Sequence, residues 1–467
     1  FHEALNVAAV WDLPVIFIVE NNGYGLSTPS AEQFRCASIA DKGIGYGMEA
    51  HSLDGNNIVE LYQQLRTIAE RIRKQPAPVL VECRTFRMRG HEEASGTKYV
   101  PQELMDLWAE KDPISNFEGH LLENGIIDAS YIEDLRGEIK KEIKEHLKKA
   151  DKLEDVKPQK EIELQDVYKE HEQKTIDTDG LPEEELRFVD AIHQGLDEVM
   201  AAWPDTILMG QDIAEYGGVF KITEGFVEKY GKERVRNTPL CESAILGIAL
   251  GLSMKSFKSM VEMQFADFVS CGFNQIVNNL AKTYYRWGQH SDVVIRMPTG
   301  GATGAGPFHS QNTEAWFFHE PGLKVVYPST PSEAKGLLLA SFEDPNPILF
   351  YEHKALYRST QEQVPTDYYT LPIGKARILK EGEEITLITY GLGVEWCKTI
   401  VENENLDAKL VDLRTLKPWD KETVQEAVKS TGKALVVHED HLTGGAGAEI
   451  AAWIGEHCFT YLDAPVM

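Results

Sequence analysis

The sequence has few cysteines, a small share of basic residues and no long hydrophobic run. Six cysteines are scattered over 467 residues without a C-x-x-C pair, which excludes a disulfide framework and the common zinc motifs and predicts reduced thiols in a cytoplasm-like compartment. No stretch reaches the ~18 apolar residues of a membrane span. Asp and Glu (74) outnumber Lys and Arg (47), and the net charge of −27 argues against binding to nucleic acid or to a membrane surface.

The remaining composition is that of an ordinary globular chain with several domains. Hydrophobic residues make up 42% and charged residues 26% of the sequence. At roughly 100–200 residues per domain, the length predicts two to four domains. The first residue is Phe1 rather than Met, and a helical apolar pattern is already running there. We therefore expect the chain to be cut at its amino terminus.

The first part of the chain alternates between helical patterns and short apolar strands. Residues 14–19 and 78–83 are typical of strands buried on both faces of a parallel sheet, and a helical pattern covers 57–75. A polar loop follows each strand, at residues 20–25 and 84–96. Because ligands of such sheets bind outside the carboxyl ends of the strands, both loops are candidates for a site.

A charged segment from Glu138 to Glu163 separates this part from the rest. It predicts a solvated amphipathic helix that runs into a linker, and a new domain begins near Phe188. Two further α/β layers follow, divided by the turn-rich segment 360–372. Their predicted strands cover 206–209, 259–262, 293–297, 324–327 and 348–351, and then 385–389, 408–412 and 434–437.

The loop from Glu20 to Gly25, with the sequence ENNGYG, is the first candidate site. Asn and Gly are ordinary turn residues, so a tight exit from the strand explains this loop without any ligand. Alternatively, an Asn amide oxygen and a backbone carbonyl supply hard oxygen ligands for Mg²⁺. The residues alone leave both interpretations open.

Glu242 stands where a strand-like stretch meets an apolar helix that runs to Met254. A carboxylate at a helix start is commonly a cap or a partner of the helix dipole. This helix is almost free of charge, however, so we expect Glu242 to be partly buried and to need a hydrogen-bonding partner, such as a ligand nitrogen.

Two pairs of histidines follow predicted strands. His309 comes after the glycine-rich residues 299–306, which lack the ending of a phosphate-binding loop, and His91 comes after two arginines. Each is either a structural histidine or a group at the mouth of a cavity. His438 and His441 lack a third metal ligand and a complete dinucleotide motif, so we interpret them as packing residues.

In their order along the chain, these motifs resemble one enzyme family over nearly the whole sequence. They are similar to those of the thiamine-diphosphate-dependent decarboxylating component of 2-oxo acid dehydrogenase complexes. Residues 1–150 resemble the later part of its α subunit, and residues from about 181 onward resemble its β subunit, so the two subunits look fused. The motifs are ENNGYG, FRMRGH, NTPLCE, EMQFADF, FNQIVN, PFHSQ, PGLKVV and LTGGAGAEI.

The resemblance implies a thiamine-diphosphate-binding fold made of parallel-sheet α/β layers in three units. A partial pyrophosphate-binding domain is expected at 1–130, followed by the charged helix and linker at 131–185. A pyrimidine-binding domain is expected at 186–358. An incomplete domain like the C-terminal domain of transketolase is expected at 372–467.

The resemblance also implies residues that bind the cofactors. Asn22 and the backbone carbonyl of Tyr24 match the family's Mg²⁺ ligands. Leu26 matches the bulky residue that holds thiamine diphosphate in its bent form. Glu242 matches the glutamate that hydrogen-bonds the aminopyrimidine ring nitrogen, and Phe268 matches the aromatic residue that stacks on that ring.

Three residues are implied to be catalytic. Glu242 shares a proton with the pyrimidine ring and so activates the cofactor. His91 and His309 match two active-site histidines, one from each half of the chain. They are expected to hold the substrate carboxylate and the lipoyl group and to move protons.

The implied reaction is oxidative decarboxylation of a 2-oxo acid with reductive acylation of the lipoyl group of an acyltransferase partner. The motifs PLCE, QFADF and LTGG favour a branched-chain substrate such as 3-methyl-2-oxobutanoate, with pyruvate as the alternative. A transketolase-like enzyme and a non-catalytic assembly subunit are further alternatives. Two copies of the fused chain would reproduce a two-α, two-β assembly, so a homodimer is expected.

Two features depart from the family pattern. The Gly-Asp-Gly segment that completes the Mg²⁺ site is missing, and the β-like part stops before the family's usual end, so we expect a chain truncated at both ends. Glu92 and Glu93 stand where mitochondrial relatives carry a phosphorylatable serine. This predicts a cytoplasmic enzyme of the bacterial type, with the mitochondrial matrix left open by the missing amino terminus.

Overall fold

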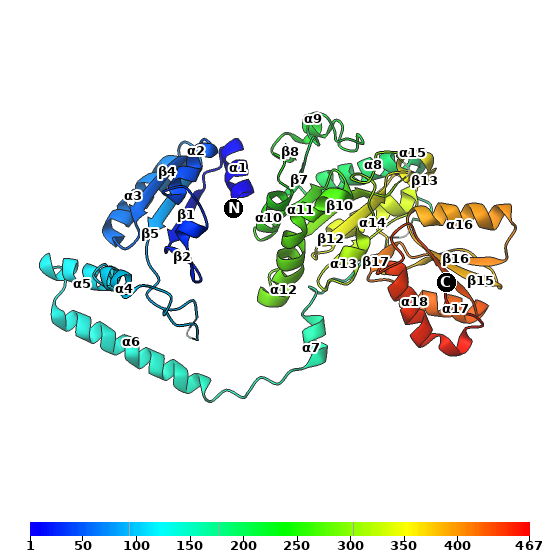
Figure 1. The fold of residues 1–467 in the computed structure, drawn as a ribbon. Coiled ribbons are helices and arrows are strands. Elements are labelled where there is room, and N and C mark those ends of the chain that lie inside the picture. Colours follow the sequence, from blue (N-terminus) through cyan, green and yellow to red (C-terminus); the bar gives the residue numbers. More distant parts are fainter. Residues whose placement is uncertain (93, 177, 302) are drawn as a thin grey trace. The chain divides into compact units, whose positions relative to one another are not determined.

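The computed structural model describes residues 1–92, 94–176, 178–301 and 303–467, which form two compact units (Figure 1). Unit 1 comprises Phe1–Pro158 and unit 2 comprises Gln159–Met467. No helix in the described ranges combines the length and the apolar character needed to cross a membrane.

Unit 1 contains a parallel sheet in the order β1-β5-β4. Its central strand is fully buried at Val79, Leu80 and Val81, since it pairs on both sides. The elements of unit 1 are α1 (His2–Val10), β1 (Ile16–Asn21), β2 (Tyr24–Gly25), β3 (Thr28–Pro29), η1 (Ser30–Glu32), η2 (Ile39–Asp41), α2 (Lys42–Gly45), β4 (Glu49–Asp54), α3 (Ile58–Ile72), β5 (Val79–Arg84), α4 (Gln102–Ala109), α5 (Pro113–Glu123) and α6 (Ala129–Ala150).

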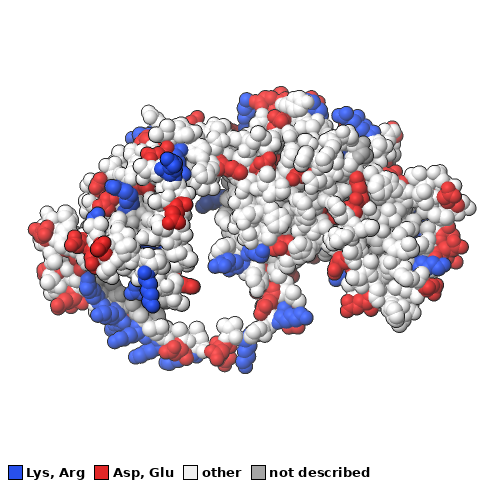
Figure 2. Space-filling model, in the orientation of Figure 1, with Lys and Arg blue, Asp and Glu red and all other residues white. Residues whose placement is uncertain are grey.

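Two expectations for unit 1 need correction. The strand β1 is not buried on both faces: Ile18 is 51% exposed, because β1 is an edge strand that pairs with β5 alone among the described strands. The charged helix α6 begins at Ala129, well before Glu138. Asp128 caps the start of this helix, since its carboxylate accepts the backbone N–H of Tyr131 at 2.8 Å. Lys and Arg side chains gather along this helix (Figure 2).

Unit 2 contains a seven-stranded sheet and a four-stranded sheet. The elements up to the end of the larger sheet's helices are α7 (Lys160–Gln165), β6 (Glu183–Arg187), α8 (Phe188–Ala202), β7 (Thr206–Gly210), α9 (Phe226–Tyr230), β8 (Val235–Asn237), α10 (Glu242–Ser253), β9 (Lys258–Glu262), η3 (Ala266–Phe268), α11 (Val269–Asn274), η4 (Gln275–Leu280), α12 (Ala281–Trp287), β10 (Val293–Thr299), α13 (Glu314–Phe318), β11 (Lys324–Val326), α14 (Pro331–Glu343), β12 (Ile348–His353), α15 (Leu356–Ser359) and β13 (Gln361–Pro365). The remaining elements are β14 (Arg377–Lys380), β15 (Ile385–Thr389), α16 (Leu392–Asn403), β16 (Ala408–Asp412), β17 (Thr415–Lys417), α17 (Lys421–Thr431), β18 (Ala434–Val437), α18 (Ala446–His457) and η5 (Phe459–Tyr461).

The larger sheet has the order β17-β11-β12-β10-β9-β7-β8 and is parallel except at β17. Its central strands β7, β9, β10 and β12 are largely buried because helices such as α8 and α14 pack against the sheet, as is visible in Figure 1. Pro331 occupies the first turn of α14, and the Thr330 hydroxyl accepts the N–H of Glu333, so this helix starts where the sequence predicts. All eight predicted strands of this unit are present.

Several strands escaped prediction, among them β6, β13 and β17. The turn-rich segment 360–372 contains β13, which pairs with β6 at the end of the predicted linker. Strand β17 belongs to residues 372–467 but lies at the edge of the larger sheet, antiparallel to β11. Each is short or polar and pairs with a distant segment, so no local pattern marks it.

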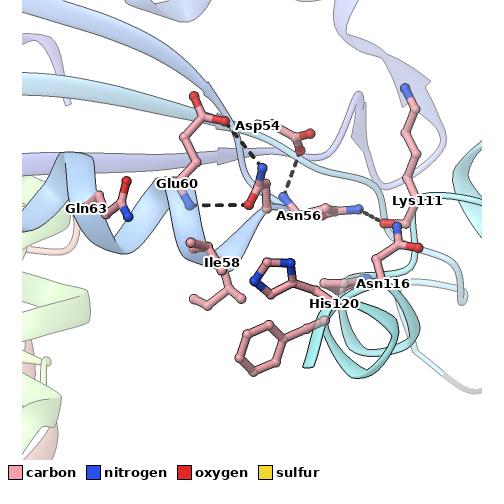
Figure 3. Close-up of a pocket in the computed structure, with 12 residues that line it drawn as sticks. Asp54, Asn56, Ile58, Glu60, Gln63, Lys111, Asn116 and His120 are labelled. Atoms are coloured by element: carbon pink, nitrogen blue, oxygen red, sulfur yellow. Dashed lines mark hydrogen bonds between the residues drawn. The ribbon is translucent and has the colours of Figure 1, made fainter. Parts of the chain in front are cut away.

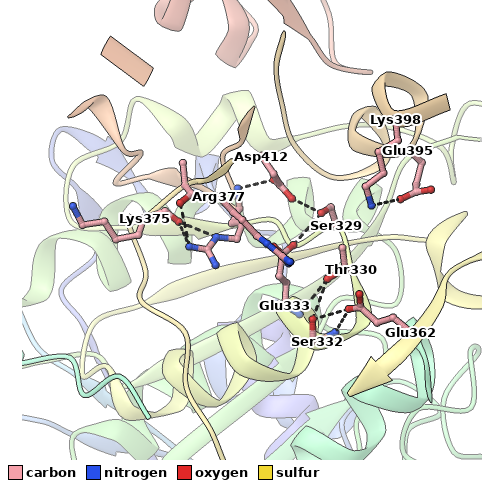
Figure 4. Close-up of polar contacts among 12 residues, drawn as sticks. Ser329, Thr330, Ser332, Glu333, Glu362, Lys375, Arg377, Glu395, Lys398 and Asp412 are labelled. Atoms are coloured by element: carbon pink, nitrogen blue, oxygen red, sulfur yellow. Dashed lines mark hydrogen bonds and ion pairs between the residues drawn. The ribbon is translucent and has the colours of Figure 1, made fainter. Parts of the chain in front are cut away.

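A polar network joins α14 to β16 (Figure 4). Ser329 Oγ contacts Glu333 Oε2 at 3.0 Å and also contacts Asp412 Oδ2. A hydroxyl carries one proton, so it can donate to only one of two carboxylates, and the other must carry a proton itself. Burial and the neighbouring charge of Glu333 raise the pKa of Asp412 well above its ordinary value, which favours Asp412 as the partner that carries the proton.

Glu314 is a second buried carboxyl group where the two sheets of unit 2 meet. It begins α13 and is 1% exposed. Its Oε1 accepts the Tyr390 hydroxyl at 3.2 Å, whereas Oε2 has no hydrogen-bond partner among the described residues. Burial, with the nearby charges of Asp440 and Glu439, raises the pKa of Glu314 to about 8.

This shift predicts that stability falls as the pH rises. Between the ordinary glutamate pKa of 4.5 and about 8, the folded protein holds the Glu314 proton and the unfolded chain does not. The contribution of protonated Glu314 to the free energy of unfolding is therefore complete below pH 4.5, falls as the pH rises, and is lost above about pH 8. We expect Glu314→Gln to raise the melting temperature by about 2 °C or more at pH 8.5 and by less than half as much at pH 5.5. An equal effect at both pH values in thermal unfolding would contradict this assignment.

Candidate active site

The predicted metal loop of unit 1 follows β1, at the carboxyl end of the strand. The Asn22 Oδ1 accepts the backbone N–H of Tyr24 at 3.0 Å. Its neighbour Asn21 has a structural role, since its amide donates to Glu82 Oε1 at 2.8 Å and its oxygen accepts the N–H of Gly23 at 3.1 Å. The turn therefore orients Asn22 while leaving its oxygen a second lone pair.

Leu26 and His91 lie in the two polar loops of unit 1, and Arg87 connects them. The Arg87 guanidinium donates to the Leu26 carbonyl at 3.1 Å and to His91 Nδ1 at 3.3 Å. Because Nδ1 accepts, neutral His91 carries its proton on Nε2. Leu26 is 50% exposed and has φ of 60°, a strained value for a side-chain-bearing residue. Glu93, expected beside His91, lies outside the described residues.

Glu242 is the first residue of α10 in unit 2 and is half-buried, as the sequence predicts. Gln211, at the end of β7, donates from Nε2 to Glu242 Oε1 at 3.3 Å. No described residue hydrogen-bonds to Oε2 of Glu242. Glu242 therefore presents one carboxylate oxygen without a partner among the described residues, at the start of an apolar helix.

Phe268 and His309 lie together in unit 2. The His309 ring is edge-on to Phe265 and Phe268, with centroids 4.8 and 5.6 Å apart. Neither ring nitrogen of His309 hydrogen-bonds to a described residue, so both are available to a ligand. Thus Glu242, Phe268 and His309 occur in unit 2, while Asn22, Tyr24, Leu26 and His91 occur in unit 1.

Of the other two candidate histidines, His438 packs as expected, since its ring stacks on Tyr390 with centroids 6.1 Å apart. His441 does not: it is exposed and contacts Asp440. Within the described ranges, no three His, Cys, Asp or Glu side chains are placed to hold a metal ion. All six cysteines are unpaired, as expected.

A pocket of about 470 Å³ opens in unit 1 between the start of α3 and α5 (Figure 3). Asn57 caps α3 by accepting the N–H of Glu60 at 3.3 Å, and Asn56 donates to the Lys111 carbonyl at 2.8 Å. Its polar groups are thus used in local structure, and none of the predicted site residues lines it.

Comparison with known proteins assigns a family to each part of the chain. The family described as "Dehydrogenase E1 component" matches residues 1–159, "Transketolase, pyrimidine binding domain" matches 184–360, and "Transketolase, C-terminal domain" matches 374–467. The 2-oxoisovalerate dehydrogenase subunit beta of Bacillus subtilis (strain 168) is 46% identical over 288 residues, covering 60% of this chain and 88% of the relative. The chain belongs to the dehydrogenase E1 components of 2-oxo acid dehydrogenases.

Further relatives are also subunits of 2-oxo acid dehydrogenases. The mitochondrial 2-oxoisovalerate dehydrogenase subunit beta 2 of Arabidopsis thaliana is 46% identical over 287 residues (60% of this chain, 80% of the relative). The pyruvate dehydrogenase E1 component subunit beta of Rhizobium meliloti (strain 1021) is 38% identical over 283 residues (60% and 62%). A solved structure described as a split-gene transketolase, inactive β4 tetramer, has a TM-score of 0.50 at 23% identity (60% and 88%), which supports the fold.

This E1 component therefore joins α-like and β-like parts in one chain, as the sequence predicts. It is a thiamine-diphosphate-dependent oxidoreductase with a transketolase-like α/β fold. Arg87 is one of the two arginines that precede His91 in FRMRGH. The sequence marked its place after a strand, but not its contacts with Leu26 and His91.

Proposed function

We propose that this E1 component decarboxylates a branched-chain 2-oxo acid, such as 3-methyl-2-oxobutanoate, and passes the acyl group to the lipoyl group of an acyltransferase partner. The observation that carries the substrate class is a difference in identity. Three β subunits of 2-oxoisovalerate dehydrogenases are 46% identical to this chain, against 38% for the pyruvate dehydrogenase subunit. Pyruvate is the alternative substrate.

The side chains present fit thiamine diphosphate and Mg²⁺. Glu242 offers a free carboxylate oxygen for the pyrimidine ring, and Phe268 offers an aromatic face. Asn22 Oδ1 and the Tyr24 carbonyl supply two of the oxygen ligands that Mg²⁺ prefers. When bound, thiamine diphosphate supplies an electron-accepting ring that allows carbon dioxide to leave.

The residues of the chain would then move protons and hold substrate. Glu242 is proposed to exchange a proton with the pyrimidine ring through Oε2, while Gln211 keeps Oε1 in place. His309 has two free ring nitrogens, which suit it to hydrogen-bond the substrate carboxylate or to deliver a proton. His91 is proposed to attend the lipoyl group, with Nε2 as donor while Arg87 occupies Nδ1. That the fused chain forms a homodimer and is located in the cytoplasm are predictions from the sequence alone.

Substrate preference tests the proposal. We expect the full-length gene product, supplied with thiamine diphosphate and Mg²⁺, to show a kcat/KM for 3-methyl-2-oxobutanoate at least about tenfold above that for pyruvate. Carbon dioxide release and acylation of a lipoyl domain would be measured together. A preference for pyruvate would contradict the branched-chain proposal. Turnover of a ketose phosphate without any lipoyl acceptor would contradict the proposed reaction.

A further inference from the structure

The backbone immediately after His309 is bound by a side chain from another part of unit 2. Asp267 Oδ1 accepts the N–H groups of both Ser310 and Gln311 at 3.2 Å. Asp267 is 6% exposed, and its Oδ2 is buried without a hydrogen-bond partner among the described residues. A buried carboxylate that accepts two backbone N–H groups is a strong anchor for those two residues.

The start of the same loop is anchored separately. Lys354 Nζ donates to the carbonyl of Gly300 at 2.7 Å, and Glu439 Oε1 accepts the N–H of Gly301 at 2.8 Å. The two ends of the loop also meet, since the Thr299 hydroxyl donates to the Gln311 carbonyl at 2.9 Å. The loop therefore begins and ends at fixed points, and His309 stands next to the second of them.

Asp267 and Phe268 are consecutive residues of η3 and act on the same histidine in different ways. Phe268 contacts the His309 ring, and Asp267 holds the backbone of the next two residues. Lys354 lies 5.6 Å from the centroid of Phe265, the other ring beside His309, and its charge attracts Asp267. The single turn η3 thus supplies a ring that contacts the His309 imidazole and a carboxylate that holds the backbone of the two residues after His309.

We propose that Asp267 is a positioning residue for His309. By holding the N–H groups of Ser310 and Gln311, it keeps the imidazole edge-on to the Phe265 and Phe268 rings, with both ring nitrogens open to substrate. This inference rests on the proposed role of His309. Asp267 itself needs no contact with substrate, because its effect passes through the backbone.

The test compares Asp267→Ala with Asp267→Asn, since the asparagine retains an amide oxygen that can accept both N–H groups. In the enzyme without substrate, we expect Asp267→Ala to speed amide hydrogen exchange at Ser310 and Gln311 by about tenfold or more. In the active enzyme, the same variant is expected to lower kcat about 100-fold and to change KM by less than about threefold. Asp267→Asn is expected to restore both measurements to near the wild-type values.

Asp292→Ala is the matched control. It removes another largely buried carboxylate, which pairs with Lys258 at 2.8 Å. Asp292 directly precedes the first residue of β10, whereas the loop that carries His309 follows the last residue of that strand. It is expected to lower stability without changing exchange at Ser310 and Gln311. Wild-type exchange and kcat in Asp267→Ala, or equal damage from Asn and Ala, would overturn the inference. If the wild-type enzyme decarboxylates no 2-oxo acid, the proposed function fails, and the exchange comparison still decides whether Asp267 holds the loop.

Discussion

Glu242→Gln is expected to lower decarboxylation of the 2-oxo acid by about 10³-fold in kcat, with the fold retained. The amide has nearly the same shape as the carboxylate, but it cannot exchange a proton with the pyrimidine ring. Gln211 can still hydrogen-bond to the remaining amide oxygen, so the start of α10 should stay intact. Carbon dioxide release and the circular dichroism spectrum would be measured on the same preparations.

Glu233→Gln is the matched control for this substitution. The Glu233 side chain is 92% exposed and lies 4.0 Å from Arg236, so neutralising it should leave the rate unchanged. If folded Glu242→Gln retained carbon dioxide release within about tenfold of wild type, a general acid–base role for Glu242 would be wrong.

Arg296→Met is expected to destabilise unit 2 by about 3–5 kcal/mol or to prevent it from folding. Arg296 is fully buried in β10. It donates to Glu262 Oε2 in β9 at 2.6 Å and to both carboxylate oxygens of Glu352 in β12 at 2.6 Å. Tyr357 donates to Glu352 as well, at 2.7 Å. Removing the guanidinium leaves two buried carboxylates without a compensating charge, which costs far more than a lost surface ion pair.

The triple variant Arg296→Met, Glu262→Gln and Glu352→Gln separates charge from packing. It has the same cavity change as the single variant but no buried charge, so it should recover a large part of the lost stability. Urea unfolding midpoints of the three proteins would be compared. A single variant within about 1 kcal/mol of wild type would show that the network contributes little.

The central strands of unit 2 could be predicted because most of their residues are apolar. Strand β10, for example, is buried at every position and interrupts its apolar run only at Arg296 before it ends in Pro298 and Thr299. Strand β17 has three residues and owes its existence to β11, a partner far away in sequence. The edge position of β1 could not be predicted either, because an apolar run does not indicate whether one or two neighbouring strands pair with it.

The candidate site shows the same division. The helix start at Glu242 and its partial burial agree with expectations drawn from the sequence. The contacts of Asp267 and Arg87 were beyond reach, because each is a side chain bonded to the backbone of a loop many residues away. Such contacts depend on the folded path of both segments, and no local spacing encodes them.

If Glu242 of this fused chain serves thiamine-diphosphate-dependent decarboxylation, carbon dioxide release from a 2-oxo acid must depend on both the cofactor and this residue. The most direct test is release of labelled carbon dioxide from carboxyl-labelled 3-methyl-2-oxobutanoate by the full-length gene product, with and without thiamine diphosphate and Mg²⁺. We expect saturable release that requires the cofactor and is lost in Glu242→Gln. Absence of release from the folded, cofactor-supplied wild-type protein, with pyruvate as well, would contradict it.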